Sequence, residues 1–152
     1  MATDRSRWGG VLPVHLRKFL TLNSSILIID DDLDFRETFR DVLELAGFEV
    51  VAAGDGEAAM VALEQHGVSL VITDILMPGM DGIDVIHAIR QRNPGLKVIA
   101  ISGGNGNSRG VPSLTMASQI GADRVLKKPF GARDLIDMVR DLLDVAPPMA
   151  GA

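Results

Sequence analysis

Charged and hydroxyl side chains follow four short apolar runs that lie far apart in the sequence. They are Asp30, Asp31, Asp32, Asp74, Ser102, Lys127 and Lys128. Carboxylates that share a cleft repel one another unless a cation lies between them, and Mg²⁺ is the usual divalent cation where phosphate is also present. A carboxylate can itself attack phosphorus and form an acyl phosphate, while a lysine and a hydroxyl would neutralise and position the transferred group. These residues therefore predict Mg²⁺-dependent phosphoryl transfer onto an aspartate.

The segments around these residues alternate regularly between strand and helix patterns. Short apolar runs predict strands at 26–29, 48–52, 68–73, 97–101 and 124–126. Apolar residues at helical spacing, closed by glycine or proline, predict helices at 35–46, 57–65, 81–92, 113–120 and 133–143. Strict alternation implies right-handed crossovers. The expected fold class is α/β, with a doubly wound, five-stranded parallel sheet.

The order of these elements decides which residues can meet. In open parallel sheets, sites lie beyond the carboxyl ends of the strands. Taken alone, an acidic run is most often a solvated turn, a single Asp is often a helix cap, and Lys-Pro usually marks a turn. Their joint occurrence after consecutive strands favours a shared site.

Length and composition are those of one compact domain. With 152 residues and 47% hydrophobic content, the chain can bury a full core. We expect the domain to span 25–145, between an extension at 1–24 and a tail at 146–152. The chain has no cysteine, which excludes disulfides and thiolate metal sites. No apolar stretch is long enough for a membrane span and no signal peptide is visible, so a cytoplasmic protein is expected.

Charge separates the extension from the rest. The whole chain carries −5 and residues 1–24 carry +3, from four basic residues against Asp4, so the remainder carries −8. An acidic body argues against direct nucleic-acid binding. The extension is either a flexible segment or a short basic helix over Val14–Leu22 that docks on a partner or a membrane surface.

Four motifs resemble the receiver domains of bacterial two-component response regulators. They are ILIIDDD at 26–32, VITDILMPGMDG at 71–82, VIAIS at 98–102 and VLKKPF at 125–130. The resemblance runs from about residue 26 to residue 145, and the segment DxxMPxMDG is highly specific. It implies the flavodoxin-like receiver fold and a role in two-component signal transduction.

The resemblance also implies a role for individual residues. Asp74 would be the phosphoacceptor, with Asp30, Asp31 and the backbone carbonyl of Leu76 completing the Mg²⁺ ligands. The hydroxyl of Ser102 would bond a phosphoryl oxygen. Lys128 would pair with the phosphoryl group, held in position by a cis peptide bond before Pro129.

Two features depart from the family pattern. Val125 stands at a position where many receivers have Tyr or Phe. No aromatic side chain can therefore rotate at this position in response to phosphorylation. The connection at 103–112 is about four residues longer than usual, with four glycines among its ten residues. It is either a mobile surface loop, or a lid or docking segment.

The leading interpretation is a stand-alone receiver that catalyses only its own phosphorylation and dephosphorylation. It would accept the phosphoryl group from a sensor histidine kinase or a histidine phosphotransfer protein. It would then pass it on in a phosphorelay or bind an unidentified target. A homodimer through the last two strand–helix units is also compatible with the sequence.

Three other functions are weaker. A Mg²⁺-dependent aspartyl-phosphate phosphatase would need a second catalytic carboxylate and a cap domain, and neither is visible. In a flavin-nucleotide binder, the acidic run after the first strand would repel the phosphate group of the nucleotide. A docking module without phosphorylation conflicts with the complete set of site residues.

Overall fold

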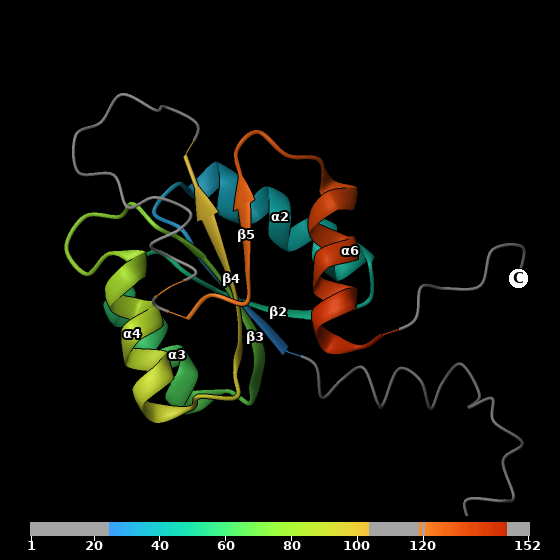
Figure 1. Cartoon of the computed structure of the whole chain (residues 1–152). Helices are drawn as coiled ribbons and strands as arrows, with labels where there is room; N and C mark the ends of the chain where they lie inside the picture. Colours follow the sequence, from blue (N-terminus) through green and yellow to red (C-terminus); the bar gives the residue numbers. More distant parts are fainter. Residues whose placement is uncertain (1–24, 104–118, 120, 146–152) are drawn as a thin grey trace, which may run out of the picture.

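A single parallel sheet organises the part of the chain that the computed structural model describes, residues 25–103, 119 and 121–145 (Figure 1). Its strands are β1 (Ser25–Ile29), β2 (Glu49–Ala53), β3 (Val68–Asp74), β4 (Lys97–Ser102) and β5 (Arg124–Lys127). They lie in the order β2-β1-β3-β4-β5, and each neighbouring pair is parallel. The predicted fold class is confirmed.

Helices cover both faces of this sheet (Figure 1). The helices α2 (Leu33–Leu45) and α6 (Ala132–Leu143) pack on one face, and α3 (Gly56–Gln65) and α4 (Gly82–Arg92) on the other. Every side chain of β1 is buried, as the continuous apolar run predicts for a strand covered on both sides. Two apolar clusters, one on each face, pack the helices against the strands.

Aspartate caps fix where three of the helices begin. The side chains of Asp32, Asp55 and Asp81 accept hydrogen bonds from the backbone N–H groups at the starts of α2, α3 and α4. Such caps satisfy N–H groups that have no partner inside the helix. The helices α2 and α3 begin within a few residues of the ends of β1 and β2, whereas seven residues separate the end of β3 from the start of α4.

The strands end slightly later than the sequence predicts. Asp74 and Ser102 are the last residues of β3 and β4, rather than the first residues after them. Backbone hydrogen bonds continue at the ends of these strands: the N–H of Ile75 donates to the carbonyl of Ile101 at 3.0 Å, and the N–H of Lys128 donates to the carbonyl of Ser102 at 2.9 Å. Sequence periodicity missed this because Asp and Ser interrupt an apolar run without ending the ladder.

Several predicted segments lie outside the described residues. They are the extension at 1–24, most of the glycine-rich connection, the helix at 113–120 apart from Gln119, and the tail at 146–152. Among the helices that are described, none is both long and apolar enough to cross a lipid bilayer.

Candidate functional site

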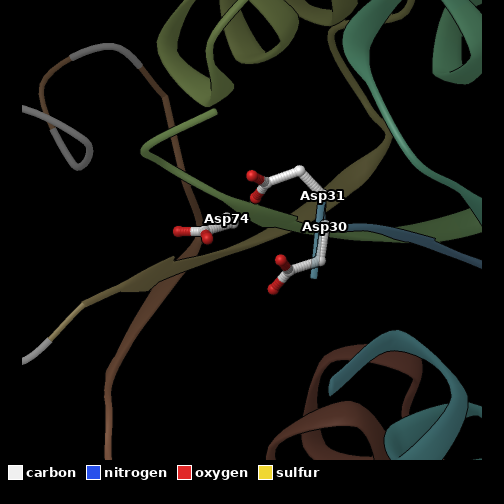
Figure 2. A group of neighbouring side chains, drawn as sticks. All are labelled: Asp30, Asp31 and Asp74. Atoms are coloured by element: carbon white, nitrogen blue, oxygen red, sulfur yellow. The ribbon is translucent and has the colours of Figure 1, made fainter. Parts of the chain in front are cut away.

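Three carboxylates meet at the carboxyl edge of the sheet. Asp30 and Asp31 directly follow β1, and Asp74 ends the neighbouring strand β3, where Ile29 is paired with Thr73. One oxygen from each carboxylate can be chosen so that all three lie within 4.8 Å of one another. Figure 2 shows the side chains gathered at the ends of these two strands.

Burial differs sharply among these three residues. Asp30 is 1% exposed and Asp74 is 8% exposed, whereas Asp31 is open to solvent. Burial raises the pKa of the Asp30 carboxyl above its ordinary value, an effect that the Asp32 N–H and Lys128 oppose and the charge of Asp74 reinforces. The site thus holds a carboxylate whose charge is costly until a cation compensates it.

Asp74 has a similar environment but different partners. Burial again raises the pKa of its carboxyl, and the charge of Lys128 and the N–H groups of Leu76 and Ile75 act against the rise. The Leu76 N–H donates to Asp74 Oδ1 at 3.3 Å. The hydroxyl of Thr73 donates to the Asp74 main-chain carbonyl at 3.0 Å. The side chain is therefore anchored at one oxygen, and Oδ2 faces Lys128.

Lys128 connects the two buried carboxylates. Its Nζ lies 3.4 Å from Asp30 Oδ2 and 3.7 Å from Asp74 Oδ2. It follows β5, its backbone N–H donates to the Ser102 carbonyl at 2.9 Å, and the peptide bond to Pro129 is cis, as the sequence resemblance implies. Two strands, β3 and β4, lie between β1 and β5, and Lys128 at the end of β5 still brings its ammonium to Asp30.

Ser102 completes the set at the end of β4. It is 7% exposed and is paired with Lys127 across the β4–β5 ladder, while Asp74 is paired with Ile101 across β3–β4. The strand order therefore brings Ser102 to the same edge as Asp74 and Lys128.

The donor chemistry fits a hard divalent cation. Three carboxylate side chains supply oxygen ligands at close range, two of them buried, and Mg²⁺ prefers oxygen ligands of this kind. A cation here would relieve the repulsion and the burial that raise the pKa values of Asp30 and Asp74.

Comparison with known proteins identifies the family. The model of the response regulator receiver domain matches residues 26–140. The chain belongs to the response regulator receiver domain family. Receiver domains are signalling domains of response regulators in two-component systems.

Individual relatives agree with this assignment. Response regulator protein FleR of Pseudomonas aeruginosa is 40% identical over 116 residues, which cover 76% of this chain and 24% of FleR. Transcriptional regulatory protein CpxR of Escherichia coli K12 is 32% identical over 120 residues, 79% of this chain and 49% of CpxR. The chain thus spans half or less of these curated relatives.

A solved receiver domain shares the fold over nearly its whole length. The receiver domain of NtrX from Brucella abortus matches with a TM-score of 0.72 and 32% identity, over 80% of this chain and 99% of that one.

The receiver's site also contains two residues that the sequence did not single out. Arg36 Nη1 donates to the main-chain carbonyl of Asp30 at 2.6 Å, and the Lys128 ammonium lies 4.0 Å from the centroid of the Phe35 ring. Phe35 is the first residue of the helix that apolar spacing predicts at 35–46, and its side chain packs against the core cluster on that face of the sheet. Its place in the first turn after the acidic run was the only available signal.

Proposed function

We propose that Asp74 accepts a phosphoryl group from the phosphohistidine of a sensor histidine kinase or a histidine phosphotransfer protein. The observation that carries this proposal is the position of Lys128, whose ammonium lies between the carboxylates of Asp30 and Asp74. Phosphoryl transfer requires positive charge next to the nucleophile, where it can stabilise the phosphoryl group in the transition state. An ammonium that lies beside the buried nucleophile Asp74 and beside Asp30 meets this requirement.

In the transfer step an oxygen of Asp74 attacks phosphorus while the bond between phosphorus and the histidine nitrogen breaks. The nitrogen leaves with the bonding electrons, and the product is an acyl phosphate on Asp74. Lys128 would pair with the phosphoryl oxygens, and the Ser102 hydroxyl would donate a hydrogen bond to one of them. The Leu76 N–H, already bonded to Asp74 Oδ1, keeps the nucleophile oriented.

Asp30, Asp31, Asp74 and the Leu76 backbone carbonyl would hold Mg²⁺. When bound, the ion neutralises charge on the carboxylates and on the phosphoryl oxygens. Asp30 is the most buried of the three carboxylates, at 1% exposure, so its charge gains most from the ion.

The chemistry is confined to the chain's own aspartate. We infer that the phosphorylated protein then passes the group to a further histidine or acts by contact with a target protein. We place these events in the cytoplasm, where a histidine kinase can be phosphorylated by ATP.

Incubation with Mg²⁺ and acetyl phosphate tests the proposal by intact mass. We expect a gain of about 80 Da, absent from Asp74→Asn and abolished by EDTA. Asp32→Asn is the matched control, because Asn also caps a helix and Asp32 is not among the proposed ligands. A gain that persists in Asp74→Asn would refute the assignment of the acceptor.

A further inference from the structure

The Lys128 ammonium is held from three sides. Besides the carboxylates of Asp30 and Asp74, the face of the Phe35 ring lies 4.0 Å from Nζ. The two ion-pair distances, 3.4 and 3.7 Å, are longer than the roughly 2.7–2.9 Å of a tight charge-assisted hydrogen bond. The ammonium is therefore shared among three partners rather than bound tightly to one.

The Phe35 ring is held in place by contacts that do not involve Lys128. Its backbone lies in the first turn of α2, where its N–H donates to Asp32 Oδ1 at 3.2 Å. The ring packs against Phe39 with centroids 4.5 Å apart, and edge-on against Phe130 at 5.9 Å. A ring with these contacts presents one face at a defined place.

Phe35, Phe39 and Phe130, here named the aromatic cluster, also connect the two segments that form the contact between Lys128 and Phe35. Phe130 follows Lys128 by two residues, and its ring lies 5.0 Å from that of Phe39. The cluster thereby connects α2 to the turn between β5 and α6. The backbone that carries the lysine and the ring that receives its ammonium are parts of one packed unit.

We propose that Phe35 is a positioning residue for phosphoryl transfer, whose ring face holds the Lys128 ammonium between Asp30 and Asp74. The proposal rests on the proposed function. A lysine side chain has a flexible four-carbon stem, and that of Lys128 is 26% exposed, so solvent offers its ammonium an alternative position. An aromatic face attracts a cation through its quadrupole, which a leucine of similar bulk lacks. Phe35 therefore keeps the cation where an incoming phosphoryl group needs it.

Phosphorylation kinetics test this with matched variants. We expect Phe35→Leu to lower the rate constant for phosphorylation by acetyl phosphate about two- to fivefold, the scale of a partly exposed cation–π contact. Phe35→Tyr, which keeps the ring face, should restore the rate. Phe48→Leu, the same exchange in the core on the same face of the sheet, should leave it unchanged. In a Lys128→Ala background, Phe35→Leu should have no further effect.

NMR gives a measurement that does not depend on phosphorylation. The ring current of Phe35 should shift the Lys128 ε-methylene protons upfield, and Phe35→Leu should abolish that shift while Phe35→Tyr retains it. Unchanged rate and unchanged shift in Phe35→Leu would overturn the proposal, as would an equal loss of rate in the Lys128→Ala background. If the wild type takes no phosphoryl group, the proposed function fails, and the chemical shift alone still decides whether Phe35 holds Lys128.

Discussion

The backbone of Gly82, at the start of α4, packs directly against the main-chain carbonyl of Asp74. A Cβ atom on residue 82 would overlap that carbonyl oxygen and lie 2.7 Å from Ile75 Cα. The Gly82 N–H also donates to the Ile75 carbonyl, at 3.0 Å. The glycine of the MDG motif thus lets a helix start in contact with the proposed phosphoacceptor.

We predict that Gly82→Ala destabilises the fold by about 1–3 kcal/mol, because the added methyl group must push the end of β3 aside. Urea denaturation would measure the loss. Phosphorylation by acetyl phosphate should also slow by about tenfold, since small displacements of a nucleophile are costly. The control is Gly67→Ala, where a Cβ would meet no atom within 4 Å. Equal stability of the two variants would mean that α4 can move away from Asp74 freely.

The burial of Asp30 leads to a second prediction. Because burial raises its pKa in the folded state, the native protein binds more protons than the unfolded chain between the two pKa values. The contribution of Asp30 to stability is therefore complete below its unfolded pKa and is lost as pH rises through the folded pKa. At about pH 7.5 without Mg²⁺, Asp30→Asn should raise the free energy of unfolding by on the order of 1 kcal/mol.

Two conditions should remove this gain. Lowering the pH through the raised pKa protonates the wild-type carboxyl, so the two proteins should converge. Saturating Mg²⁺ should stabilise the wild type and leave the variant little changed, since a ligand stabilises only the state that binds it. Asp41→Asn, on the exposed side of α2, corrects for the change in net charge. A variant less stable than wild type at neutral pH without Mg²⁺ would contradict the electrostatic argument.

Most of the site could be predicted from the sequence because its residues lie at the carboxyl ends of neighbouring strands. The apolar runs showed that Asp30, Asp74 and Ser102 come at the ends of strands. The parallel topology places the carboxyl ends of those strands on the same side of the sheet. The contact between Lys128 and Phe35 could not be predicted in this way. It joins residues 93 positions apart through side-chain packing, and periodicity shows that a ring is buried without showing what its face touches.

The exposed side chain next to the acceptor predicts a long-lived acyl phosphate. Leu76 is 43% exposed, and its own N–H binds Asp74 Oδ1. A leucine there cannot orient a water molecule toward phosphorus. Leu76→Gln, which supplies an acceptor and donors, should speed loss of the phosphoryl group by about three- to tenfold, below the range of a full general base. The decay of the phosphorylated mass after removal of the donor measures this, with Leu76→Met as the apolar control. Rapid loss from the purified wild type would refute the prediction.

The last prediction concerns Arg90, which ties α4 to the turn before β5. Its guanidinium donates to the carbonyls of Gly121, Pro94 and Leu96 and to the Asp123 carboxylate at 2.9 Å. Asp123 Oδ2 in turn accepts from the Val98 N–H at 2.8 Å. Arg90 and Asp123 are mostly buried, at 20% and 28% side-chain exposure, so removing the cation leaves several acceptors without a donor.

We therefore expect Arg90→Ala to cost about 2–4 kcal/mol in unfolding free energy. Arg92→Ala is the matched control, because its ion pair with Glu64 is largely exposed, at 62% and 70%, and such pairs contribute about 0–1 kcal/mol. The hydrogen bonds of Arg90 lie at the amino ends of β4 and β5, whereas Asp74 lies at the carboxyl end of β3. Phosphorylation of the folded Arg90→Ala protein at low temperature should therefore proceed at the wild-type rate. A variant that stays stable but loses phosphorylation would show instead that this network acts on the site across the sheet.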